Sequence, residues 1–165
     1  VAFVGQQLVV KVRRSTEGGG RMQPEFSPRA AKIRPVASPR PLRKILIVDD
    51  DEEGVQTFAR ILKLEGYSVQ TALNADMGLS VAQLNHPDAI ILDLHMPLVD
   101  GLGFLRRLRS HDAQRDTPVA IVTGDYFLDD SISNEIKGLG AQVTHKPLFF
   151  EELVGLARRL LEVIH

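Results

Sequence analysis

The sequence predicts an α/β domain over residues 44–165, in which helices cover both faces of a five-stranded parallel sheet. Five short aliphatic runs alternate with stretches whose apolar residues have helical spacing. The aliphatic runs lack the polar and apolar alternation of a half-exposed strand, which indicates burial on both faces. Because right-handed crossovers connect parallel strands, the intervening helices are expected on both sides of the sheet.

The first two strand–helix pairs are predicted between residues 44 and 84. Residues 44–48 (KILIV) form the first strand, and the helix after it is marked by Val55, Phe58 and Leu62 at helical spacing. Gly66 is expected to end this helix. A second strand is predicted at 67–73 and a second helix at 74–84.

Three further pairs complete the predicted domain. Their strands are expected at 88–94, 118–123 and 141–145. A weak helical pattern occupies 129–137. The third and fifth helices have clear apolar stripes, formed by Leu102, Leu105 and Leu108 in the third and by Leu153, Leu156, Leu160 and Ile164 in the fifth.

Residues 1–43 differ in composition from the predicted domain. They are rich in Gly, Pro and Arg and show no apolar period, so we expect a disordered basic arm. Residues 1–44 carry a formal charge of +8, and the remainder carries −9. Because an acidic domain binds nucleic acid poorly and the arm is too irregular for a DNA-binding module, no direct DNA binding is expected.

Composition excludes two further kinds of protein. The chain has no Cys, so it can form neither a disulfide scaffold nor a thiolate metal site. No segment approaches the roughly 18 consecutive apolar residues that a membrane span needs. We therefore expect a cytoplasmic protein without membrane contact.

Charged and hydroxyl side chains stand at the ends of four predicted strands. Asp49 and Asp50 follow the first strand, and Asp93 lies at the end of the third. Thr123 ends the fourth strand and Lys146 follows the fifth. Each residue alone would be interpreted as a cap, a turn residue or a solvated charge. Because ligands bind beyond the carboxyl ends of parallel strands, the shared position favours a single site instead.

The chemistry of this set indicates a divalent cation and a phosphoryl group. Carboxylates within about 4–6 Å of each other repel, and oxygen ligands favour Mg²⁺, Mn²⁺ or Ca²⁺ over zinc. Mg²⁺ is usually held by one or two carboxylates. The remaining carboxylate, Asp93, would be free to act as a nucleophile and form an aspartyl-phosphate. Lys146 and Thr123 would stabilise the phosphoryl oxygens by charge and hydrogen bonding.

Other polar residues are interpreted structurally. Asp51 is expected to cap the first helix. The exposed face of the third helix is expected to carry Arg106, Arg107 and Arg109. No histidine metal site is predicted. The histidines near predicted strand and helix ends are not paired at a spacing typical of metal ligands; they are His95, His111 and His145.

Four motifs in this order resemble those of a two-component response-regulator receiver domain of the single-domain, CheY-like type. The motifs are ILIVDDD at 45–51, ILDLHMPLVDG at 91–101, VTG at 122–124 and Lys146-Pro147. The resemblance covers residues 44–165. It implies a doubly wound (βα)5 fold with the flavodoxin-like strand order 2-1-3-4-5.

The resemblance also implies a role for each residue of the site. Asp93 is expected to be the phosphoryl acceptor, and Thr123 and Lys146 the residues that stabilise the phosphoryl group and switch. The ligands of Mg²⁺, or alternatively Mn²⁺, are expected to be Asp49, Asp50, Asp93 and the backbone carbonyl of His95. The peptide bond between Lys146 and Pro147 is expected to be cis.

Two positions depart from the family pattern. The residue three before the lysine, commonly an aromatic that swings inward on activation, is Val143. His95 stands where a small or amide residue is often found, so its side chain affects the access of water to the acyl-phosphate.

The expected partner is the phospho-histidine of a sensor histidine kinase or of a histidine phosphotransfer protein. The downstream target is expected to be a protein that contacts the fourth helix, fifth strand and fifth helix. The domain would catalyse its own phosphorylation without being a turnover enzyme, and with no output domain after it, a stand-alone receiver or phosphorelay intermediate is expected. Two alternatives stay open. A receiver that binds partners without phosphorylation is favoured by Val143, and an aspartyl-nucleophile phosphatase would need a second acid at the position of His95.

Overall fold

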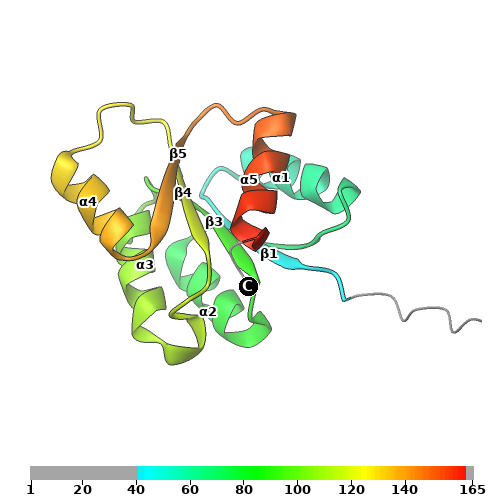
Figure 1. Cartoon of the computed structure of the whole chain (residues 1–165), viewed down its shortest axis with the longest axis horizontal. Helices are drawn as coiled ribbons and strands as arrows, with labels where there is room; N and C mark the ends of the chain where they lie inside the picture. Colours follow the sequence, from blue (N-terminus) through cyan, green and yellow to red (C-terminus); the bar gives the residue numbers. More distant parts are fainter. Residues whose placement is uncertain (1–40, 163–165) are drawn as a thin grey trace, which may run out of the picture. The chain divides into compact units, whose positions relative to one another are not determined.

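A computed structural model describes residues 41–162, so residues 1–40 of the predicted arm and Ile164 of the predicted last helix lie outside the described residues. The structure confirms the predicted fold class and strand order. One parallel sheet has the order β2-β1-β3-β4-β5 (Figure 1). Its strands, in chain order, are β1 (Lys44–Val48), β2 (Ser68–Ala72), β3 (Ala89–Asp93), β4 (Val119–Thr123) and β5 (Ala141–His145).

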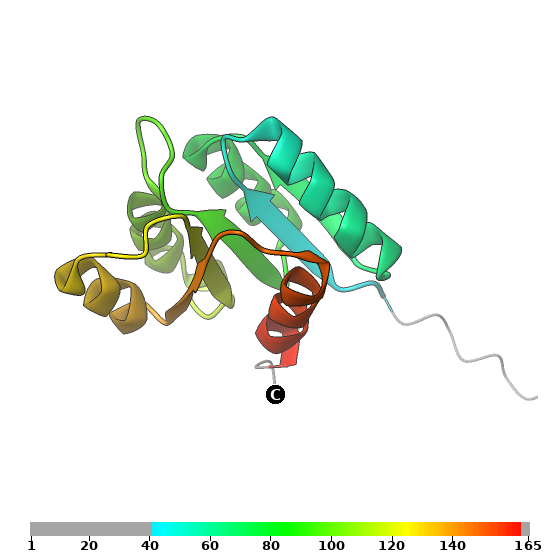
Figure 2. The same cartoon turned by 90° about the horizontal axis from the view of Figure 1, so that it is seen from above.

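Five α-helices connect and follow the strands. They are α1 (Glu52–Leu64), α2 (Ala75–Asn85), α3 (Gly101–Ser110), α4 (Asp130–Gly138) and α5 (Phe150–Glu162), with a short 3₁₀ helix, η1 (Asp112–Gln114), after α3. Figures 1 and 2 show α1 and α5 on one face of the sheet and α2, α3 and α4 on the other. Within residues 41–162, no helix has the length and apolar character to cross a membrane. A cytoplasmic location stays a prediction.

Each central strand contributes to two hydrophobic cores, one on each face. Ile45 and Ile47 pack with α1 and α5, whereas Leu46 and Val48 pack with α2 and α3. Every residue of β3 and β4 is buried. The continuous apolar runs of the sequence therefore come from burial on both faces of the sheet.

Local signals set the helix boundaries. Side chains of Asn74, Asp100 and Asp129 accept hydrogen bonds from backbone amides in the first turns of α2, α3 and α4. Gly66 follows the end of α1 with a φ of +89°, a conformation that glycine adopts without a steric penalty. Its predicted role as the end of the first helix is confirmed.

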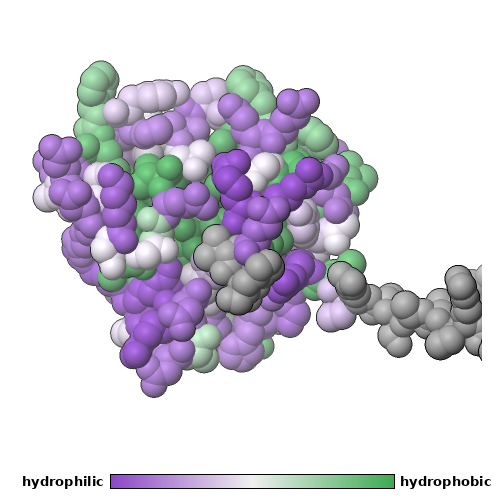
Figure 3. All heavy atoms as spheres, in the orientation of Figure 1, coloured by the Kyte–Doolittle hydropathy of each residue, from purple (hydrophilic) through white to green (hydrophobic). Residues whose placement is uncertain are grey.

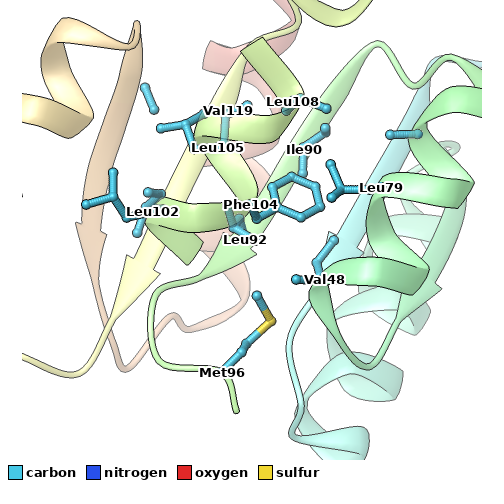
Figure 4. Packing of buried hydrophobic residues seen from close by; sticks show 14 of the residues in the cluster. Val48, Leu79, Ile90, Leu92, Met96, Leu102, Phe104, Leu105, Leu108 and Val119 are labelled. Carbon is cyan, nitrogen blue, oxygen red and sulfur yellow. The ribbon is translucent and has the colours of Figure 1, made fainter. Parts of the chain in front are cut away.

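The core beneath α2 and α3 is packed around one aromatic ring. Phe104 is fully buried, and Figure 4 shows its ring between Leu79 of α2 and Ile90 and Leu92 of the sheet. A Cβ atom on Gly78 would lie 2.9 Å from the Phe104 ring, which is closer than real contacts allow. The ring and the absent side chain together fix the distance between α2 and α3.

The start of α3 is held tightly against the end of β3. A Cβ atom on Gly101 would lie 2.9 Å from the Cα of Leu94, and the Gly101 amide donates to the Leu94 carbonyl at 2.8 Å. Glycine is therefore required here because the backbone of α3 approaches the strand end. This contact closes the loop that leaves Asp93.

Arg109 does not lie on the exposed face of α3 as predicted. It is partly buried, and its guanidinium donates to the carbonyl oxygens of Leu139 and Thr117, both at 2.8 Å, and of Gln114 at 3.1 Å. Several N–H donors in one planar group let it satisfy carbonyls at the end of α4 and around η1 together. Arg106 does lie on the surface, where it forms a two-pronged ion pair with Glu135 of α4.

Replacing Phe104 by alanine should lower the free energy of unfolding by about 3–5 kcal/mol, because it leaves a cavity that the tightly packed helices cannot close. Urea denaturation measures this loss. Leu84→Ala is the control, since Leu84 is 80% exposed on α2 and should change stability by less than about 0.5 kcal/mol. Equal effects of the two substitutions would contradict the packing described here.

Candidate functional site

Three carboxylates meet at the carboxyl edge of the sheet. Oxygens of Asp49, Asp50 and Asp93 all lie within 4.8 Å of one another. Asp49 and Asp50 follow β1 and Asp93 ends β3, and these strands pair in parallel with Val48 opposite Leu92. The register of two neighbouring strands thus forces their acidic ends together. Asp93 is buried, Asp49 is partly buried and Asp50 is exposed.

A lysine that follows the edge strand β5 contacts two of these carboxylates. Lys146 follows β5, and its Nζ lies 2.8 Å from Oδ1 of Asp93 and 2.9 Å from Oδ2 of Asp49. Its backbone amide donates to the carbonyl of Thr123 at 2.8 Å. The peptide bond from Lys146 to Pro147 is cis. The ammonium group therefore offsets part of the negative charge at the centre of the cluster.

Backbone amides satisfy the remaining acceptors near Asp93. The amide of His95 donates to Oδ2 of Asp93 at 2.7 Å. Thr123 is fully buried at the end of β4, and its Oγ1 accepts the amide of Asp125 at 3.1 Å. The structure thus brings the predicted residues of the site to one edge, with Asp93 between the lysine and the loop that starts at His95.

The environment shifts the pKa values of both central groups. Burial raises the pKa of Asp93, and the charge of Asp49 raises it further, while hydrogen bonds from Lys146 and the His95 amide only partly oppose this rise. Burial alone would lower the pKa of Lys146, but hydrogen bonds and charges from Asp93 and Asp49 outweigh burial and raise it. Lys146 therefore stays charged, and the ionised form of Asp93 is destabilised.

The donor set fits a hard divalent cation. All three side-chain ligands are carboxylates, and they supply more negative charge than Lys146 alone balances. Such oxygen ligands suit Mg²⁺ or Mn²⁺. Among the described residues this is the cluster of His, Asp and Glu that can hold a metal ion.

Asp51 lies outside this cluster, but it does not cap α1 with its side chain. It occupies the N-cap position with extended backbone angles, and no helix amide donates to its carboxylate. Its own amide donates to Oδ1 of Asp49 at 2.9 Å. Its contribution is therefore to orient Asp49, which differs from the predicted capping role.

Tyr126 is a residue of this region that sequence reasoning missed. Its hydroxyl donates to the carbonyl of Lys146 at 2.5 Å, and its ring stacks on His145 with centroids 5.1 Å apart. The only signal in the sequence is its position three residues after Thr123, in a loop without periodicity. Val143 is partly buried and packs against the core under α2, α3 and α4.

Exposed apolar side chains lie in the loops at the carboxyl edge of the sheet, the edge that carries the carboxylate cluster. Leu98, Phe127 and Phe149 are 103%, 95% and 69% exposed, and they belong to the loops after β3, β4 and β5. Figure 3 shows apolar atoms along the upper edge, over the β4–α4 and β5–α5 loops. Leu98 has a φ of +68°, within a tight turn in which the Val99 amide donates to the Pro97 carbonyl at 2.8 Å.

The fold and this site place the chain in a known class of signalling domain. A model of the response regulator receiver domain family matches residues 45–158, and the chain belongs to that family. It is thus a receiver domain of two-component signalling.

Two relatives of known name are similar to this chain over the receiver region. The chain is 36% identical over 126 residues to the transcriptional regulatory protein PrrA of Mycobacterium tuberculosis, covering 76% of this chain and 51% of that protein. It is 38% identical over 121 residues to the response regulator MprA of Mycobacterium sp. (strain KMS), covering 72% and 50%. The chain therefore spans about half the length of these relatives.

A solved structure shares the fold along almost its whole length. The chemotaxis protein CheY4 of Vibrio cholerae is 30% identical, with a TM-score of 0.68 over 73% of this chain and 99% of that chain.

The predicted partner set needs correction. We expected the downstream partner to be a protein and expected no direct DNA binding. This is contradicted by the relatives, because PrrA is named a transcriptional regulatory protein. The prediction was drawn from the acidic charge of the domain and the irregular arm. Those features describe one domain, and they carry no information about output segments of the longer relatives.

Asp93→Asn should raise the stability of the metal-free protein at pH 7. Because the folded state holds the Asp93 proton more tightly, stability is greatest below the ordinary Asp pKa of about 3.9 and falls as pH rises through the higher folded value. The substitution removes this loss, and Asp49 still pairs with Lys146.

Thermal unfolding in EDTA measures the difference. In EDTA, the difference in stability between the variant and the wild type should become smaller toward pH 4. Without EDTA, Mg²⁺ at 100 times its Kd should stabilise the wild type by about 2.7 kcal/mol, and it should stabilise the variant less. A variant that is less stable than the wild type at pH 7 in EDTA would contradict the assigned pKa direction.

Proposed function

We propose that this domain accepts a phosphoryl group on Asp93 from a phospho-histidine donor, with Mg²⁺ or Mn²⁺ as cofactor. The observation that carries the proposal is the position of the Asp93 carboxylate. It is 6% exposed, belongs to a cluster of three carboxylates and has Lys146 Nζ 2.8 Å from one oxygen. Family membership supports the same assignment.

The residues of the cluster have separate roles in the proposed reaction. Asp49, Asp50 and Asp93, with the backbone carbonyl of His95, would hold the cation. When bound, the cation neutralises charge that develops on the phosphoryl oxygens. The charge of Lys146 would add to this neutralisation. Asp51 keeps the Asp49 carboxylate oriented through its amide.

Phosphoryl transfer requires the Asp93 carboxylate to attack phosphorus in line with the leaving nitrogen. A new P–O bond forms, the P–N bond breaks, and its electron pair stays on the imidazole nitrogen. The product carries about −1.5 to −2 charge, by analogy with other phosphorylated side chains. Lys146 pairs with this charge, and the Thr123 hydroxyl, which already accepts the Asp125 amide, donates its proton to a phosphoryl oxygen.

The reaction stops at the phosphorylated side chain, so the domain acts as a switch and not as a turnover enzyme. The relatives named for transcription suggest that the switch regulates transcription in a longer protein. A receiver that binds partners without phosphorylation is the second candidate; Val143, which stands where the family commonly has an aromatic residue, favours it weakly, and the complete set of site residues argues against it. The two candidates differ in whether Asp93 gains phosphate.

Asp93→Asn should abolish phosphate incorporation from acetyl phosphate and Mg²⁺, because an amide oxygen is a poor nucleophile for phosphorus. Intact-protein mass spectrometry measures incorporation. The matched control is Asp51→Asn, which removes a neighbouring carboxylate outside the cluster and should leave incorporation intact. EDTA should abolish incorporation in both the wild type and the control.

Phosphate on the Asp93→Asn variant at the wild-type level would rule out the acceptor assignment. A wild-type protein that gains no phosphate from any donor would instead favour the phosphorylation-independent candidate.

The exposed apolar side chains around the cluster give the phosphodonor protein a surface to contact. Phe149→Ala should slow transfer from a phosphorylated histidine phosphotransfer protein by about tenfold, equivalent to about 1.4 kcal/mol. Transfer from acetyl phosphate should not change, because this donor is too small to reach Phe149 while reacting at Asp93. Rapid-quench transfer assays measure both rates.

Leu42→Ala is the control for that experiment. Leu42 is 61% exposed, but it precedes β1 and so lies at the opposite edge of the sheet. It should have no effect on either rate. Equal slowing with both donors would show that Phe149 acts on the chemistry of Asp93 and not on docking.

A further inference from the structure

Tyr126 connects the loop after β4 to the end of β5. Tyr126 is 63% exposed, yet its side chain makes two defined contacts. The ring stacks on His145 with an interplanar angle of 13°, and the hydroxyl donates to the Lys146 carbonyl at 2.5 Å. Both partners belong to the segment that delivers the lysine to the carboxylates (Figure 1).

Lys146 is the first of two pocket residues connected to Tyr126, and it is the one that Tyr126 contacts directly. The Nζ of Lys146 bridges Asp93 and Asp49, while its carbonyl accepts the Tyr126 hydroxyl. Its amide is held by the Thr123 carbonyl. A phosphoryl group on Asp93 would place new negative charge beside the Lys146 ammonium. The backbone carbonyl of the same residue accepts the hydrogen bond from Tyr126.

Thr123 is the second. Its Oγ1 accepts the amide of Asp125, and the Asp125 carboxylate accepts the amide of Phe127 at 2.9 Å. Tyr126 lies between these two residues in the chain. When the Thr123 hydroxyl turns to donate to a phosphoryl oxygen, the hydrogen bond that fixes this turn changes. The two residues expected to respond to the phosphoryl group are thus both linked to Tyr126.

Val143 cannot provide this link. It packs against the core under α2, α3 and α4, and its aliphatic side chain has no group that donates or accepts a hydrogen bond. The Tyr126 hydroxyl and ring lie instead at the end of the same strand, β5, in contact with the backbone of Lys146 and the ring of His145.

We propose that Tyr126 is a positioning residue that transmits the state of the Asp93 pocket to the loop before α4, through Lys146 and Thr123. The proposal rests on the proposed phosphorylation of Asp93. Because coupling between two sites is reciprocal, the same contacts fix the position of Lys146 when the loop is held.

Tyrosine emission reports on this contact directly. The sequence contains two Tyr and no Trp, so Tyr67→Phe leaves Tyr126 as the single emitter. Acetyl phosphate with Mg²⁺ should change its emission in proportion to phosphate incorporation, since the hydroxyl and the ring change partners. The double variant Tyr67→Phe with Asp93→Asn should show no change. Full incorporation in Tyr67→Phe with unchanged emission would overturn the proposal.

Hydrogen exchange tests whether the contact transmits the response. In Tyr67→Phe, phosphorylation should change amide exchange in residues 127–130 by about fivefold, the effect of one hydrogen bond. The Asp125 amide is left out because the Thr123 hydroxyl holds it independently of the Tyr126 side chain. Tyr126→Phe keeps the ring for stacking and removes only the hydroxyl. It should gain phosphate to the same extent and lose most of the exchange response.

Two outcomes would contradict the proposal in distinguishable ways. If Tyr126→Phe is phosphorylated and residues 127–130 respond as in Tyr67→Phe, Tyr126 has no transmitting role and the proposed function stands. If neither variant nor the wild type gains phosphate, the proposed function fails, and with it any state for Tyr126 to transmit.

Discussion

Repulsion among three carboxylates is the constraint on which the rest of this structure depends. Parallel pairing of β1 with β3 holds Asp49, Asp50 and Asp93 within 4.8 Å of one another. Lys146 offsets part of their charge, and burial still raises the pKa of Asp93. This concentration of charge suits the cation and the phosphoryl group that we propose, because both would change the same electrostatic balance.

The remainder of the domain keeps that edge rigid. Cores on both faces of the sheet fix the strands, and Gly101 lets α3 begin directly against the end of β3. Arg109 bonds carbonyls at the end of α4 and around η1. The loops at the carboxyl edge are more exposed, and they carry Leu98, Phe127 and Phe149. The same edge thus carries a rigid pocket and accessible apolar side chains, which suits the large phosphodonor protein that we propose as a partner.

Tyr126 changes how a switch without an aromatic at position 143 is understood. The family resemblance draws attention to Val143, where the expected aromatic is missing. The structure places a hydroxyl and an aromatic ring next to Lys146 from the β4–α4 loop instead. Its links to both Lys146 and Thr123 give the pocket a physical route to that loop, although position 143 of β5 carries no aromatic ring.

The five strands, the helices between them and the acidic residues at the strand ends could all be predicted from the amino-acid sequence. Continuous aliphatic runs indicate a sheet covered on both faces, and parallel strands then place Asp49 and Asp93 at one edge. Three features depended on tertiary contacts or loop geometry: Arg109 is partly buried, Asp51 does not cap α1 with its side chain, and Tyr126 contacts Lys146. The contacts of Arg109 and Tyr126 join loops and helix ends far apart in the chain, where no periodicity constrains the side chain. Asp51 instead turned on local loop geometry, because its amide bonds Asp49.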